Sequence, residues 1–196
     1  MRLHNLTVLG VLLLGLAFGS GCSGLEIKYK PTTPVDAVTK TSIALRVDDA
    51  RPMDRGRETG TRVGTVRGSF GIPEHMEDKN ADVAPHTVTD ATADALRRSG
   101  VGVQAGSAKT LVATINEFWM DGFMGYACKV VVVYALNDAS GKAIWNAEVT
   151  GASGGSDAFS SPKKLTLTLF TRALADLSTH AGEQFSSPAF QQALNQ

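Results

Sequence analysis

Apolar and polar residues alternate in several stretches after residue 40, which is typical of strands that bury one face. Ile43, Leu45 and Val47 share one face of the first such stretch, and Pro52 ends it. A stretch rich in glycine and arginine follows up to about Val83, and we interpret it as a loop. The pattern therefore predicts a strand and a long loop at the start of the folded region.

Two helices are predicted by apolar residues spaced three and four apart. The first begins near Pro85 and ends at Gly100, which suits a left-handed helix stop. The second begins at Ser161-Pro162, a cap and a first-turn proline, and a short helix is expected after Pro188. The apolar stripes consist of Val88, Ala91, Ala95 and Leu96 in the first helix, and Leu165, Leu169, Ala173, Leu177 and Ala181 in the second.

Three strands in succession are expected between the helices. Asp121-Gly122 is a two-residue turn signal, and a turn there pairs Met120 with Phe123. A second turn at residues 138–141 pairs Leu136 with Ala143. The two turns give one consistent core face. Its members on the first two strands are Leu111, Ala113, Ile115, Trp119, Tyr126, Cys128, Val130, Val132 and Tyr134, and Trp145 and Ala147 follow on the third.

The order strand, helix, three strands, helix predicts an α+β fold. We expect a two-layer sandwich with a mostly antiparallel sheet and helices on one face. Residues 41–196 suffice for a single domain with its own core.

The N-terminus has the organisation of a secretory signal over residues 1–21. Arg2 is followed by an uncharged apolar run at residues 6–18 and by small residues at 19–21. The run is too short to span a bilayer. We therefore expect an exported protein.

Residues 19–22, Gly-Ser-Gly-Cys, resemble the end of a bacterial lipoprotein signal. The resemblance implies that Cys22 becomes the lipid-bearing N-terminus, and Ser23 implies sorting to the outer membrane, facing the periplasm. Gly19 departs from the aliphatic residue usual there, and the alternative is ordinary cleavage that leaves Cys22 as a free thiol. Residues 22–40 are expected to form a flexible tether, part of which can lie on the domain as an edge strand.

The folded region resembles the uncharacterised bacterial lipoproteins typified by YajG. The matching features are Asp49-Ala50-Arg51 at a strand end, the loop VGTVRGSFG at residues 63–71, a helix ending at Gly100, an alternating strand and a C-terminal helix. The resemblance covers most of residues 40–186. It implies an exported lipoprotein and a fold, but no reaction.

Charge and motifs exclude several function classes. The chain has 19 basic and 19 acidic residues, so nothing attracts it to nucleic acid. GASGG matches a hydrolase pattern around Ser153, with Asp176 and His180 following, but no helix starts directly after the serine as that motif requires. His75 and His86 lie among carboxylates without zinc spacing. We expect no enzyme, no cofactor and no metal.

Two features are candidate partner-binding sites. Arg51, Arg55, Arg57, Arg62 and Arg67 lie in the glycine-rich stretch, which either binds an acidic partner or lipid headgroup or is a solvated loop with local ion pairs. In the predicted register, three apolar side chains fall opposite the core face near the hairpin tip, where they either bind a partner or are covered by the loop or the tether. These are Phe118, Met120 and Phe123.

The sequence thus predicts a lipid-anchored, non-catalytic binding or assembly module of the bacterial envelope, with an envelope protein as partner. Two alternatives stay open. One is a carrier that holds a small ligand or lipid in a cavity between helices and sheet, and the other is a serine hydrolase that uses Ser153.

Overall fold

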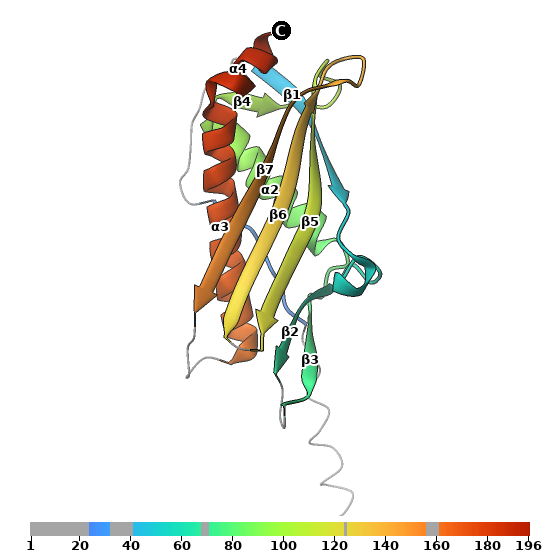
Figure 1. The fold of residues 1–196 in the computed structure, drawn as a ribbon, viewed down its shortest axis with the longest axis vertical. Helices are drawn as coiled ribbons and strands as arrows, with labels where there is room; N and C mark the ends of the chain where they lie inside the picture. Colours follow the sequence, from blue (N-terminus) through green and yellow to red (C-terminus); the bar gives the residue numbers. More distant parts are fainter. Residues whose placement is uncertain (1–23, 32–40, 68–70, 124, 156–160) are drawn as a thin grey trace, which may run out of the picture.

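Residues 24–31, 41–67, 71–123, 125–155 and 161–196 are described by a computed structural model. Within these residues, seven strands form one sheet, and the long helices cover one of its faces (Figure 1). The strands are β1 (Thr41–Asp49), β2 (Arg62–Arg67), β3 (Pro73–Glu77), β4 (Val101–Val103), β5 (Thr110–Gly122), β6 (Tyr126–Asn137) and β7 (Ala143–Gly155), and the helices are the 3-10 turn η1 (Met53–Arg55), α2 (Val83–Arg98), α3 (Pro162–Ser186) and α4 (Pro188–Asn195).

The α+β sandwich with helices on one face is as expected, but the sheet is mixed rather than mostly antiparallel. β5 is central: β6 pairs with one edge, and β1 and then β2 pair in parallel with the other. β7 follows β6 in antiparallel pairing, and β3 pairs antiparallel with β2. β1 runs parallel to β5 because α2 carries the chain back along the sheet between them.

The predicted turn at Asp121-Gly122 is wrong, because β5 continues through both residues and β6 begins at Tyr126. The register shifts between Ile115 and Glu117, so that Asn116 forms a bulge. A bulge inserts one residue into a strand and reverses which side chains face the core beyond it. On β5, Leu111, Ala113 and Ile115 therefore lie on the predicted face, whereas beyond the bulge Phe118 and Met120 face the core in place of Trp119. The predicted core residues of β6 from Cys128 onward are buried as expected.

The turn between β6 and β7 keeps the predicted faces but shifts the pairing by two residues. Tyr134 pairs with Ala147, and Leu136 pairs with Trp145. The Asp138 carboxylate accepts hydrogen bonds from the backbone N–H groups of Ser140 and Lys142, at 2.8 and 3.0 Å. This enlarged turn replaces the predicted four-residue turn.

The glycine- and arginine-rich stretch is not one long loop, because it contains η1 and the β2–β3 hairpin. Val63 and Val66 of β2 are buried, which anchors the hairpin to the core. A Cβ at Gly64 would lie 2.5 Å from the Met120 carbonyl oxygen, so only glycine permits this approach of β2 to β5.

The GASGG segment is the end of strand β7 and not a loop. A Cβ at Gly151 would lie 2.1 Å from the Ala173 carbonyl oxygen and 2.6 Å from Leu177. The glycine therefore lets α3 pack closely against β7. Side chains fill the space between the sheet and the helices, among them Ile115, Val130 and Leu169, each with no exposed surface.

Candidate functional site

The two ends of the sheet are formed by different elements (Figure 1). At one end β2, β5 and β7 finish, and β3, β6 and α3 begin. We call this the hairpin end and define it by Arg67, Ile72, Phe123, Lys163 and Lys164. At the other end α4 and the last turn of α3 pack on β6 and β7; we call this the aromatic end and define it by Tyr134, Trp145, Phe185 and Phe190.

Residues 24–31, which we call the N-terminal strap, lie on the domain in extended form. Leu25, Ile27 and Tyr29 are buried, and the charged residues between them are exposed. Leu25 forms a parallel bridge with Asp78 at the end of β3. The Ile27 backbone N–H donates to the Asp78 carboxylate at 2.6 Å. Part of the predicted tether was expected to lie on the domain as an edge strand, and the strap takes that place.

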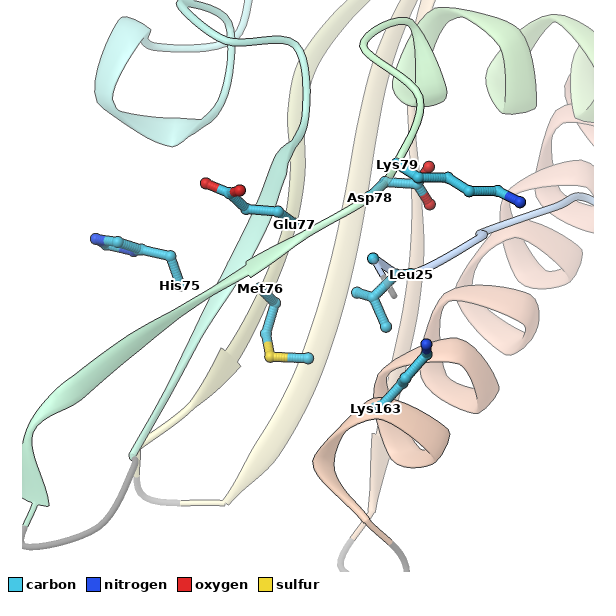
Figure 2. A pocket seen from close by; sticks show the side chains of 8 residues that line it. Leu25, His75, Met76, Glu77, Asp78, Lys79 and Lys163 are labelled. Carbon is cyan, nitrogen blue, oxygen red and sulfur yellow. The ribbon is translucent and has the colours of Figure 1, made fainter. Parts of the chain in front are cut away.

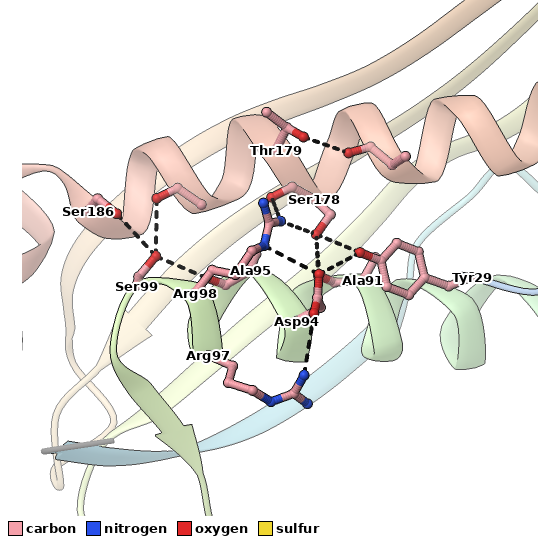
Figure 3. A network of polar contacts seen from close by, with 12 residues as sticks. Tyr29, Ala91, Asp94, Ala95, Arg97, Arg98, Ser99, Ser178, Thr179 and Ser186 are labelled. Carbon is pink, nitrogen blue, oxygen red and sulfur yellow. Dashed lines mark hydrogen bonds and ion pairs between the residues drawn. The ribbon is translucent and has the colours of Figure 1, made fainter. Parts of the chain in front are cut away.

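A buried polar network fastens the strap to both long helices (Figure 3). The Tyr29 hydroxyl donates to the Asp94 carboxylate of α2 at 2.7 Å and lies 3.0 Å from the Ser178 hydroxyl of α3. Arg98 donates to the Ser178 carbonyl at 2.7 Å and forms an ion pair with Asp94 at 3.3 Å. Burial, more than these contacts, raises the pKa of Tyr29 to about 12. The phenol is therefore a neutral donor at physiological pH.

A pocket of about 520 Å³ lies where the strap begins (Figure 2). Leu25 and Met76 point toward each other there, and Lys79 and Lys163 contribute charge at the rim. Lys79 forms an ion pair with Glu26 at 2.7 Å. Hydrogen bonds from Lys28 and then Lys79 lower the pKa of Glu26 to about 2. The pocket lies between β3, the strap and the first turn of α3. Core side chains such as Ile115, Val130 and Leu169 fill the space between the helices and the central strands, where a ligand was predicted.

Two of the three apolar residues proposed as a partner surface belong to the core instead. Phe118 is 1% exposed and Met120 has no exposed surface. The Phe118 ring stacks on Phe170 of α3 at 4.6 Å between centroids. The bulge at Asn116 is the reason, because it turns these side chains to the helix side. Phe123 alone remains partly exposed, at the hairpin end.

Arg51 is buried and contacts no solvent, which contradicts its predicted place in a solvated or partner-binding loop. Its guanidinium donates to the Asp49 carboxylate through Nε and Nη2, at 3.0 and 2.8 Å. It also lies 5.8 Å from the centre of the Phe118 ring. A buried charge needs such a partner, so Arg51 acts as a structural residue beneath β2.

Two of the other predicted arginines, Arg55 and Arg67, contact residues of the domain's own surface. Arg55 pairs with Glu117 at 3.3 Å and lies 5.6 Å from the Trp119 ring centre. Arg62 is half-buried on β2. Arg67 is exposed, and its guanidinium lies 5.7 Å from the centre of the Phe123 ring. Arg67 and Phe123 are thus the predicted binding residues that the structure brings together at the surface.

Ser153, Asp176 and His180 lie near one another, where α3 packs along β7, but they do not form a hydrogen-bonded chain. The Ser153 hydroxyl donates to the Leu169 carbonyl at 2.7 Å. Asp176 accepts from the Ala152 backbone N–H at 2.9 Å. His180 Nδ1 lies 3.1 Å from the Thr150 carbonyl oxygen, which raises the pKa of His180. Each side chain therefore joins α3 to β7.

Cys22, the predicted site of lipid attachment, and most of the predicted tether lie outside the described residues. Cys128 is buried as predicted, and burial raises the pKa of its thiol. Among the described residues, no helix is both long and apolar enough to cross a membrane, and His, Cys, Asp and Glu form no group of three able to hold a metal ion.

An edge strand within the tether was predicted, but the burial of its apolar residues and the polar network that joins it to both long helices were not. The alternation in LEIKYK, residues 25–30, was the available signal, because apolar and charged residues change places there at strand spacing. The partner of Tyr29 had no comparable signal. Asp94 lies in a helix pattern among alanines and would ordinarily be assigned to the solvent face.

Comparisons with known proteins establish the fold and nothing finer. No protein-family model matches the chain, and no curated protein matches it. A crystal structure of a Xanthomonas campestris protein of family DUF330 has a TM-score of 0.58 at 17% identity and covers 89% of this chain and 98% of its own. An uncharacterised protein has a TM-score of 0.51 at 15% identity, covering 82% of this chain and 100% of its own. The expected YajG-type family therefore gains no support from a family model.

Proposed function

We propose that this protein is a lipid-anchored module of the bacterial cell envelope that binds or assembles with an envelope partner and performs no catalysis. The observation that carries the proposal is the junction between signal and domain. Cys22 ends a lipoprotein-like signal, and the strap begins only two residues later, at Gly24. An anchor at Cys22 therefore leads directly into packed structure.

The arrangement of the polar side chains supports a binding role over a hydrolytic one. The Ser153 hydroxyl donates to the Leu169 backbone carbonyl, and the imidazole of His180 contacts the Thr150 carbonyl instead of the serine. A serine nucleophile needs a base within hydrogen-bond reach and a sharp turn after the strand. Ser153 instead lies inside β7, paired with Cys128.

The test is the intact mass of the protein extracted from native envelope with detergent. The expected result is a chain that begins at Cys22 and carries acyl mass. Cys22→Ala should lack that mass and leave the membrane fraction, whereas Cys128→Ala should behave as wild type. A wild-type chain without acyl mass would contradict the proposal. If the acyl mass is found, cross-linking before extraction identifies the partner: a partner that depends on the anchor is captured with wild type and lost with Cys22→Ala.

A further inference from the structure

We infer that the hairpin end rests on the lipid bilayer, held there by the short reach of the anchor. The inference depends on the proposed lipidation of Cys22. Its occupant is the membrane surface itself, and its contact residues are Arg67, Ile72, Phe123, Lys163 and Lys164.

The direction of the chain at Gly24 supports this orientation. The Leu25 backbone N–H donates to the Glu77 carbonyl, and the Leu25 carbonyl accepts from the Lys79 N–H, each at 3.0 Å. The bridge is parallel, so the chain passes Leu25 in the same direction as β3 runs. β3 begins at the hairpin end. The chain therefore enters the domain from the side of the hairpin end.

The reach of the anchor is shorter than the hairpin. Two residues, extended fully, span about 7 Å between Cys22 and Gly24. Gly24 lies beside the end of β3, and the four steps from Glu77 back to Pro73 span about 13 Å. With Cys22 at the bilayer surface, the start of β3 consequently lies level with the headgroups or beyond them.

The strap is held too firmly for the domain to lift off by releasing it. Leu25, Ile27 and Tyr29 are 2%, 3% and 8% exposed. Burying such side chains stabilises the folded state in proportion to the apolar surface that is removed from water. The hydrogen bonds to Asp78 and Asp94 add to this hold. The fixed point of the anchor is therefore Gly24.

The surface chemistry of the hairpin end fits a headgroup layer. Ile72 is 63% exposed, the highest value among the large apolar side chains of the described residues. Arg67, Lys163 and Lys164 are exposed at the same end, as are the carboxylates of Glu74 and Asp121. An apolar side chain among cations suits an interface with anionic lipid.

The experiment places a fluorescent label at each end of the lipidated protein. Ile72→Cys labels the hairpin end, and Ser140→Cys labels the β6–β7 turn at the opposite end. Cys128 is buried, and the Cys22 sulfur is blocked by its lipid, so the introduced thiol takes the label. The labelled proteins are reconstituted in vesicles of phosphatidylethanolamine and phosphatidylglycerol that contain a nitroxide-bearing lipid.

We expect the nitroxide to quench the label at position 72, whereas the label at position 140 should keep its emission. A flexible Gly-Ser insert of about 20 residues between Ser23 and Gly24, with a mean reach of roughly 25 Å, should restore emission at position 72. If the protein is acylated but its two labels respond alike, the proposed orientation is wrong and the proposed function stands. If the acyl mass is absent, both the orientation and the proposed function are wrong. Unchanged quenching with the insert would refute the role of anchor length.

Discussion

The aromatic end and the hairpin end close the same sandwich in different ways. At the aromatic end, Phe190 packs on Trp145 at 4.8 Å and on Phe185 at 5.1 Å, and Lys109 donates to the last carbonyls of α4. At the hairpin end, the core ends at Val66 and Met120, and Phe123 and Ile72 lie at the surface. The aromatic end therefore contributes mainly to the stability of the fold, and the hairpin end offers surface for contact. Changes at the aromatic end should affect folding, whereas changes at the hairpin end should affect where the protein lies.

The largest effect tests where the hairpin end begins. Phe118→Ser removes a buried ring that stacks on Phe170. We expect the free energy of unfolding to fall by roughly 3–5 kcal/mol. Phe123→Ser should cost no more than about 1 kcal/mol, the size of its contact with Arg67. Urea unfolding of each single variant measures both. Equal losses would place Phe123 in the core.

A smaller effect is expected from the aromatic end itself. Phe190→Ala should lower the free energy of unfolding by about 3 kcal/mol, because the buried ring is the main hold of α4 on the sheet. Trp145 fluorescence should change as α4 loosens. Ile72→Ala is the matched change at the hairpin end, and it should stay within about 0.5 kcal/mol of wild type. A costly Ile72→Ala would remove the distinction between the ends.

The contact of α3 with β7 lies between the two ends of the sheet. Adding a single methyl group at Gly151 tests how tightly the two elements pack. Gly151→Ala should cost about 1–3 kcal/mol, since the added Cβ meets the Ala173 carbonyl and α3 must shift. Gly155→Ala is the control on the same strand, because a Cβ there meets nothing within 4 Å. Thermal unfolding distinguishes them. A neutral Gly151→Ala would mean that α3 is free to move along the sheet.

The smallest effect concerns the strap and depends on pH. The folded protein raises the pKa of Tyr29 from 10.0 to about 12. Between these values the unfolded chain loses the phenolic proton and the folded chain keeps it, so the stabilisation present below pH 10 is lost as the pH rises toward 12. Tyr29→Phe should lower stability by about 1 kcal/mol at neutral pH.

The same variant should also lack the additional fall in stability above pH 10. Urea unfolding at pH 7, 9 and 10.5 compares it with wild type. Tyr134 also has a raised pKa because it is buried, and it contributes equally to both proteins. The difference between the two curves therefore reports Tyr29. Parallel curves would show that the hydroxyl does not hold the strap.

Sequence patterns predicted the elements better than their contacts. The helix stop at Gly100, with φ of 77°, and the Ser161 cap on α3 have strong local signals, and both are confirmed. The turn at Asp121-Gly122 also had a strong local signal, yet pairing of β5 with β2 and β6 carried the strand through it. The bulge at Asn116 had no local signal, and its one extra residue reversed the faces of Phe118 and Trp119.

The candidate site was less predictable than the fold for a physical reason. Burial of Arg51 depends on the Asp49 carboxylate and on the ring of Phe118, which lies far away in the sequence. From the sequence alone, an arginine that lies among glycines is expected to be exposed to solvent. The hairpin end likewise depends on β2 and β5 finishing side by side, and that parallel pairing follows from the whole topology rather than from either strand.

The contacts of Asp176 and His180 with β7 also limit how the protein can associate. A strand at the edge of a sheet presents free N–H and C=O groups that can template another strand. Here Asp176 occupies the Ala152 N–H and His180 occupies the Thr150 carbonyl. A second chain therefore meets carboxylate and imidazole in place of an open backbone along this part of β7. The helix that completes the core thus also protects the chain from sheet-to-sheet aggregation at this edge.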